Sequence, residues 1–165
     1  MTSDQQEARA ATITTPGERD IHIVRVFDAP RDHVFAVYTD PALIPEWWGP
    51  RGGTTVVDAM DVRAGGHWRF VFRNPDGSED GFRGTYREVT PPERIVQTFE
   101  WEGMPGHVSV ETTTFEDLGD RTRVTTTSIF HTPEERDGMI ASGMERGLNE
   151  TYARLDEVLA GRSRR

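Results

Sequence analysis

The chain has 165 residues, of which 35% are hydrophobic, and a formal net charge of -9 at pH 7. This length predicts one domain with a sizeable core. There is no cysteine and all 19 basic residues are arginine, so disulfides, thiolate metal sites and lysine Schiff bases are excluded. The acidic balance argues against binding to nucleic acid or an anionic membrane surface, and no apolar run is long enough to span a bilayer.

The first 19 residues are polar and predict a disordered leader, residues 1–19. They lack the apolar core of a signal peptide, so a cytoplasmic location is expected. The folded domain is expected over residues 20–160, followed by a basic tail, residues 161–165.

The domain opens with a β-rich stretch, residues 21–27, followed by two short helical patterns. The first covers residues 31–38. In the second, Asp40 can cap the helix and Pro41 takes the first helical position, where no N–H is needed. Gly49 and the proline after it close this helix.

The middle of the chain consists almost entirely of strand patterns. Trp68, Phe70 and Phe72 alternate with charged residues, which predicts one buried and one solvated face. Turns rich in Gly, Pro, Asn and Asp separate the strands. The strands expected here are 56–61, 67–73, 81–89, 94–101, 107–116 and 122–131.

The chain ends with the only long helical pattern, residues 132–159. Thr132 can cap its start, Pro133 fits the first position, and Gly161 is expected to stop it. At 1.5 Å per residue the helix would span roughly 40 Å. Its apolar stripe consists of Ile140, Met144, Leu148, Tyr152, Leu155 and Leu159.

Three glycines interrupt this helix, at Gly138, Gly143 and Gly147, and each costs up to about 1 kcal/mol relative to Ala. Two explanations stay open. Either the sheet approaches closely there, or side-chain volume is withheld to leave a hollow, beside the adaptable side chains of Met139 and Met144.

One strand, two short helices, six further strands and one long helix predict an α+β fold. In it, a curved antiparallel sheet of six or seven strands wraps around the C-terminal helix. The gap between the sheet and the helix can be filled by bulky side chains or remain a pocket.

Several motifs occur in a specific order. They are Val26 to Pro30 followed by Val34-Phe35, Trp47 to Pro50, Asp61 with Gly65 to Trp68, Gly84-Thr85-Tyr86, Pro91 to Ile95 leading to Trp101, and Thr122 to Thr125. Together they resemble the START-like, or SRPBCC, superfamily, and within it the family related to the C-terminal domain of the activator of Hsp90 ATPase. The resemblance covers about residues 20–159. Leu148 departs from it, because many relatives carry Trp there.

The resemblance implies a helix-grip fold with a hydrophobic cavity. Relatives include lipid and hormone carriers, polyketide aromatases and cyclases, antibiotic self-resistance proteins and the Hsp90 co-chaperone domain. The main hypothesis is therefore binding of a small hydrophobic molecule, aromatic or polycyclic, between sheet and helix. The alternatives are a metal-free cyclase or aromatase using the same cavity, and a co-chaperone-like domain.

The expected cavity wall combines aromatic rings with two methionines and a glycine, a composition suited to aromatic ligands. Its residues are Trp47, Trp48, Trp68, Phe70, Tyr86, Phe99, Trp101, Met139, Gly143 and Met144. The tryptophan pair could form a lid over the pocket or pack as core at the end of the domain.

Six polar residues could reach the cavity and move protons there: Arg69, Arg83, Glu111, Ser128, His131 and Glu145. Alternatively, Arg69, Arg83 and Glu111 lie on the solvated face of the sheet and pair with cross-strand charges. The five histidines lack the spacing of a metal site, so no metal and no other cofactor is expected. A small hydrophobic ligand is the expected partner, and the sequence is compatible with a monomer or a homodimer.

Overall fold

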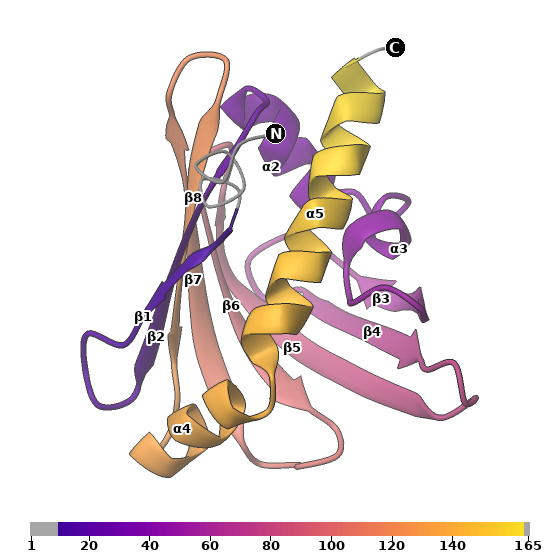
Figure 1. Ribbon diagram of the computed structural model, residues 1–165, viewed down its shortest axis with the longest axis vertical. Coiled ribbons are helices and arrows are strands. Elements are labelled where there is room, and N and C mark those ends of the chain that lie inside the picture. Colours follow the sequence, from indigo (N-terminus) through magenta and orange to yellow (C-terminus); the bar gives the residue numbers. More distant parts are fainter. Residues whose placement is uncertain (1–9, 164–165) are drawn as a thin grey trace.

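A computed structural model describes residues 10–163 of the chain (Figure 1). Eight antiparallel strands form one curved sheet in the order β1-β2-β8-β7-β6-β5-β4-β3. Helix α5 (Met144–Ser163) crosses the concave face, while α2 (Arg31–Thr39) and α3 (Ile44–Trp47) lie toward one end. This arrangement confirms the predicted helix-grip fold. Within the described residues, no helix is long and apolar enough to cross a membrane.

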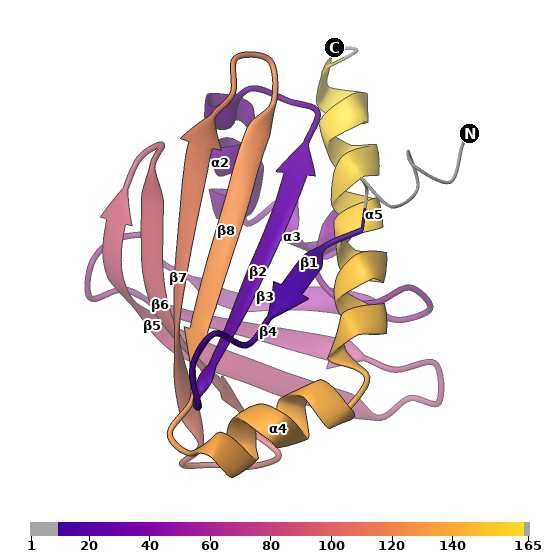
Figure 2. The ribbon, with the colours of Figure 1, turned by 60° about the vertical axis from the view of Figure 1, so that its left-hand side comes forward.

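The sheet brings together strands from opposite ends of the chain, because β2 pairs with β8 over its whole length. Figure 2 shows β1, β2 and β8 on one side of α5, with β3 and β4 passing behind it. The strands are β1 (Thr12–Thr14), β2 (Asp20–Phe27), β3 (Thr54–Met60), β4 (His67–Arg73), β5 (Glu79–Thr90), β6 (Arg94–Trp101), β7 (Val108–Asp117) and β8 (Thr122–Ile129).

The concave face carries the core, as the alternating pattern predicted. Trp68 and Phe70 on β4 are buried, and Phe27 on β2 packs edge-on against Tyr152 of α5 at 5.2 Å between ring centroids. Leu155, on the same helix, is fully buried. Each large apolar side chain that is removed from water contributes about 1.5–3 kcal/mol, so this sheet–helix contact supplies much of the fold's stability.

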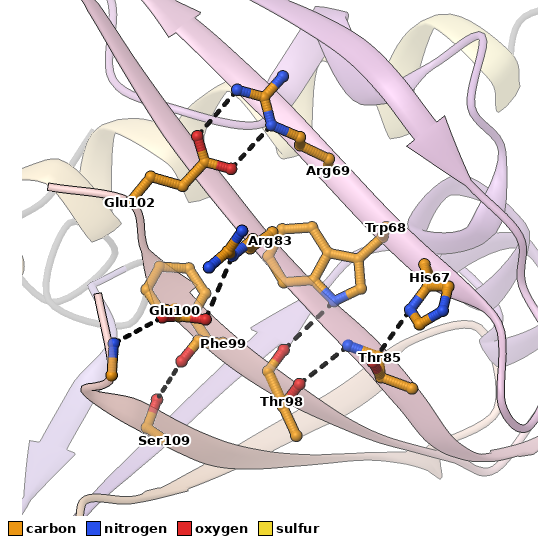
Figure 3. Close-up of polar contacts among 11 residues, drawn as sticks. His67, Trp68, Arg69, Arg83, Thr85, Thr98, Phe99, Glu100, Glu102 and Ser109 are labelled. Atoms are coloured by element: carbon orange, nitrogen blue, oxygen red, sulfur yellow. Dashed lines mark hydrogen bonds and ion pairs between the residues drawn. The ribbon is translucent and has the colours of Figure 1, made fainter. Parts of the chain in front are cut away.

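Gly84 allows the tightest part of this core. A Cβ at position 84 would lie 1.9 Å from the Thr98 carbonyl oxygen and 2.6 Å from Nε1 of Trp68. Because glycine leaves this space open, the Trp68 indole can lie over β5 and donate to Thr98 O at 3.2 Å (Figure 3).

The predicted disordered leader, residues 1–19, differs from the structure in its second half. Residues 12–14 form β1, in which Ile13 pairs with Ile23 of β2. Ala11 is buried, and its N–H donates to Oδ1 of Asn149 on α5 at 3.1 Å. The sheet therefore has eight strands instead of the predicted six or seven. Residues 1–9 lie outside the described part of the chain.

The predicted single helix over residues 132–159 is wrong, because the structure divides it into α4 (Pro133–Ala141) and α5. Gly143, with a φ of +85°, has a left-handed backbone that ends α4 and redirects the chain. The capping at Thr132 is confirmed: its hydroxyl accepts from the Glu135 N–H at 3.1 Å. Helix α4 turns away along the edge of the sheet (Figure 2), which leaves Ile140 exposed.

Two other boundaries differ. Asp40 accepts from the Ala42 N–H at 3.0 Å, but it caps a turn, and α3 itself begins at Ile44. Gly161 does not stop the last helix, which runs on to Ser163. Neither shift alters the core, because the apolar residues of both helices still face the sheet.

Candidate functional site

A cavity of about 170 Å³ lies between the concave face of the sheet and helices α2, α3 and α5. Six aromatic side chains line it: Tyr38, Trp47, Trp48, Phe70, Tyr86 and Tyr152. Five aliphatic side chains complete the apolar wall: Ile23, Ile44, Met60, Ile95 and Leu148. Five further residues place polar groups on it: Gln97, Glu111, Thr113, Thr126 and Thr151.

Strand alternation explains how polar residues reach an apolar cavity. Gln97 has the same parity as Ile95 on β6, and Glu111 and Thr113 have the same parity as buried Phe115 on β7. Successive side chains of a strand point to opposite faces, so these polar residues share the inner face with the core.

Among the described residues that line the cavity, Glu111 is the acidic one. Its Oε2 accepts a hydrogen bond from the Ser128 hydroxyl at 3.3 Å, across the β7–β8 pair. Burial raises the pKa of Glu111 to about 7, although the Ser128 hydrogen bond opposes the shift. The carboxyl group can therefore exchange a proton with a bound molecule near neutral pH.

Two tyrosine hydroxyls meet beside this carboxyl group, from α2 and α5. The two hydroxyl groups lie close enough for each to influence the pKa of the other, and Thr126 lies beside Tyr152. Burial raises the pKa of Tyr152 to about 12 and that of Tyr38 well above its usual value. Both hydroxyls are therefore neutral at physiological pH and act as hydrogen-bonding groups.

The positively charged side chain nearest this polar cluster already forms an ion pair. Arg25 on β2 is buried and donates to both carboxylate oxygens of Asp156 on α5, at 2.9 and 2.6 Å. Its guanidinium also lies 4.6 Å from the ring centroid of Phe27. This pair ties α5 to the sheet and leaves the Glu111 carboxyl group to face the cavity.

The structure brings four of the ten predicted wall residues together on this cavity: Trp47, Trp48, Phe70 and Tyr86. Trp47 is buried and donates to the Val37 carbonyl at 3.4 Å, whereas Trp48 is half-buried and packs edge-on against Phe70 at 5.1 Å. The tryptophan pair is thus both end-of-domain core and cavity wall.

The other six predicted residues do not line this cavity. Trp68 and Phe99 belong to a ring cluster behind Phe70, with Trp68 4.9 Å from Phe70 and 6.0 Å from Phe99. Trp101 lies at the strand end with 39% of its surface exposed. The remaining three, Met139, Gly143 and Met144, lie at or near the break between α4 and α5.

The three glycines of the helical pattern do not mark a close approach to the sheet. A Cβ at Gly138, Gly143 or Gly147 would meet no atom within 4 Å. Gly138 and Gly143 are exposed, so neither lies over the cavity.

Two of the polar candidates, Glu111 and Ser128, do reach the interior. Placing Glu111 on the solvated face was therefore wrong, whereas Arg69 and Arg83 do lie there (Figure 3). Arg69 forms two hydrogen bonds of 2.8 Å with Glu102, and Arg83 pairs with Glu100 at 3.2 Å. The remaining candidates, His131 and Glu145, are exposed.

Sequence patterns alone did not reveal the polar residues opposite the rings. Gln97 shares its strand parity with Ile95 and Phe99, which are expected to face inward, so its position could have been inferred. Thr113 and Thr126 lie in strands rich in threonine, where no clear apolar alternation marks the buried face. Tyr38 and Tyr152 fit an ordinary core pattern, because their meeting depends on how α2 and α5 cross.

A larger hollow of about 290 Å³ lies between α3 and α5 on the outside of the domain. Three of its four charged side chains are already paired: Arg51 with Glu157, and Arg154 with the backbone carbonyls of Gly49 and Pro45 at 2.9 and 3.1 Å. Because these contacts fasten the helix to the loop, we interpret the groove as structural.

Comparisons with known proteins place the fold among solved structures. A protein from Rhodobacter sphaeroides with a known crystal structure is 27% identical to this chain in sequence, and the two structures superpose with a TM-score of 0.87. The match covers 92% of this chain and 99% of that chain. A solution structure from Arthrobacter aurescens is 27% identical with a TM-score of 0.83, covering 91% of each chain. DynU16, a protein in the dynemicin biosynthetic locus, is 21% identical with a TM-score of 0.66, covering 88% of this chain and 48% of its own, and shares the fold alone.

No curated protein matches the chain. The profile of one family, described as activator of Hsp90 ATPase homolog 1-like protein, matches residues 28–160, most of the domain. This range contains both short helices, the strands from β3 to β8 and nearly all of α5. The chain therefore belongs to the activator of Hsp90 ATPase homolog 1-like family.

Proposed function

We propose that the chain binds a small, largely apolar molecule in the cavity between the sheet and α5. The observation that carries the proposal is the wall itself, in which rings and aliphatic side chains surround a few polar groups. Binding sites for small molecules share this composition, because apolar walls supply affinity and a few polar groups fix orientation.

The cavity volume limits the ligand to about one aromatic ring. A cavity of about 150 Å³ holds benzene, whereas sites for drug-sized ligands measure about 300–1,000 Å³. At about 170 Å³ the cavity falls near the lower value, which narrows the expected aromatic or polycyclic ligand to a single-ring compound.

Filling the cavity tests this proposal. In Leu148→Trp an indole would occupy the space beside the rings, while Ala160→Trp places the same side chain on the exposed surface of α5. Titration calorimetry with the single-ring compounds phenol and 2-phenylethanol should show binding in the wild type and in A160W. Affinity in L148W should fall about tenfold or more, because a filled cavity excludes the ligand.

The proposal would be wrong if no single-ring compound bound to the wild type, or if L148W, folded as judged by circular dichroism, bound as well as A160W. Preferred binding of a three-ring compound such as anthraquinone-2-sulfonate would overturn the size limit alone.

A second candidate function is an enzyme of the cyclase or aromatase kind, and Glu111 favours it. A cavity carboxyl group with a pKa of about 7 suits general acid–base catalysis at neutral pH. Incubation with a metabolite extract and mass spectrometry separates the two functions. Recovery of an unchanged bound compound supports binding, whereas a compound altered by the wild type and not by Glu111→Gln supports catalysis.

A further inference from the structure

The described residues of the cavity wall include an acidic side chain and no basic one. Of the wall residues, all of which lie in the described part of the chain, Glu111 is acidic and none is arginine or histidine. The nearby cation, Arg25, is neutralised by two hydrogen bonds to Asp156. A ligand in this cavity therefore meets a source of negative charge on the wall and no positively charged wall residue.

The aromatic side chains strengthen this asymmetry. The faces of Trp and Tyr rings attract cations through their quadrupoles, most strongly where water is excluded. Trp48, Tyr86 and Tyr152 contribute rings to the same cavity as the Glu111 carboxyl group. An ammonium group and a carboxylate in such surroundings form a charge-assisted hydrogen bond, about twice as strong as a neutral one.

The Glu111 carboxyl group has spare acceptor capacity. Among the contacts within residues 10–163, one hydrogen bond reaches it, from Ser128 to Oε2. A carboxylate can accept about four hydrogen bonds, and a buried one left without donors is costly. A donor on the ligand would relieve that cost.

We infer that the cavity selects a small organic ammonium ion, such as a single-ring arylalkylamine, with the Glu111 carboxylate as its counter-ion and the surrounding rings as a cage. This inference rests on the proposed function and names the ligand class for the same cavity. An anionic ligand would be repelled by Glu111, and a neutral one would leave the ring–cation attraction unused.

The test compares two ligands that differ in one group, 2-phenylethylamine and 2-phenylethanol. Calorimetry at pH 7 should show that the wild type binds the amine about tenfold or more tightly than the alcohol. In Glu111→Gln the ratio should fall to near one. Glu145→Gln makes the same change on the exposed face of α5, and it should keep the wild-type ratio.

Proton release gives a second readout. The titratable groups around the carboxyl are Tyr38 on α2, Tyr86 on β5, Tyr152 on α5 and Arg25 on β2, and burial raises the pKa of each tyrosine. Glu111 is thus the group that titrates near pH 7. Amine binding should expel part of its proton, measured as a difference in heat between Tris and phosphate buffers, and alcohol binding should not.

The outcomes separate the two proposals. If the alcohol binds and the amine binds no better, the ammonium inference is wrong while the cavity still binds small molecules. If the preference persists in E111Q, Glu111 is not the counter-ion and the inference is wrong. If neither compound binds, and phenol also fails to bind, the proposed function is wrong as well.

Discussion

Glu100 on β6 and Glu111 on β7 lie on neighbouring strands but face opposite sides of the sheet. The Glu100 side chain is only 14% exposed, yet its pKa is lowered, because it accepts from the Gly106 N–H at 2.7 Å and pairs with Arg83. Glu111 accepts from the Ser128 hydroxyl, the nearby Arg25 is paired with Asp156, and burial raises the pKa of Glu111 to about 7. The comparison shows that partners, and not burial alone, decide the charge of a carboxyl group.

The outer face uses charge for local pairing. Arg69 pairs with Glu102 and Arg83 with Glu100 (Figure 3), and Arg73 on β4 pairs with Glu79 on β5. On the inner face an unpaired charge is expensive, so a lone carboxyl group there indicates a role other than stability.

The largest expected effect comes from breaking the inner ion pair. Arg25→Gln should lower the free energy of unfolding by about 3 kcal/mol, because it leaves the partly buried Asp156 without its cation. Arg123→Gln is the matched change on the outer face, where Arg123 and Glu116 are largely exposed. It should lower the free energy of unfolding by less than about 1 kcal/mol. Urea denaturation of both variants measures the contrast, and equal costs would contradict it.

The next effect depends on pH. Because the pKa of Glu111 is raised from 4.5 to about 7, the folded chain binds more protons than the unfolded chain in that window, and stability falls as pH rises. Glu111→Gln removes this loss. The free energy of unfolding of this variant, measured relative to that of the wild type, should therefore rise by about 2 kcal/mol between pH 5 and pH 8. A difference in unfolding free energy that stays constant across this range would mean that Glu111 has an ordinary pKa.

In Glu100→Gln, the stability relative to the wild type should change with pH in the opposite direction. A lowered carboxylate pKa stabilises the fold above the unfolded-state pKa, and this contribution is lost as pH falls through the folded-state pKa. The variant should therefore be about 1 kcal/mol less stable at pH 7, with the difference shrinking below about pH 4. Thermal unfolding at both pH values measures it, and a variant more stable at pH 7 would break the comparison.

The smallest effect concerns the helix that covers the inner face. Gly147 lies within α5, and a Cβ added there would have no atom within 4 Å, so Gly147→Ala should stabilise the fold by about 0.5 kcal/mol. Gly143→Ala should instead destabilise it by about 1 kcal/mol, because φ there is +85°. Opposite shifts in melting temperature would support this account, and equal shifts would contradict it.

Much of the fold could be predicted from the chain alone. Alternation in 67–73, the proline and threonine at the start of α4, and the order of the elements all depend on neighbours in sequence. The break at Gly143 was harder to predict, since glycine inside a helical pattern is compatible with either continuation or a stop.

The sequence by itself determined the apolar composition of the core, the order of the elements from β2 to β8 and the family. The tertiary structure decided that Glu111 faces inward and that Tyr38 meets Tyr152 beside it. The reason is physical: β7 and β8 are rich in threonine, which is compatible with either face. Only the strand pairing and the crossing of α5 place one carboxyl group among rings, on a wall whose described residues include no cation.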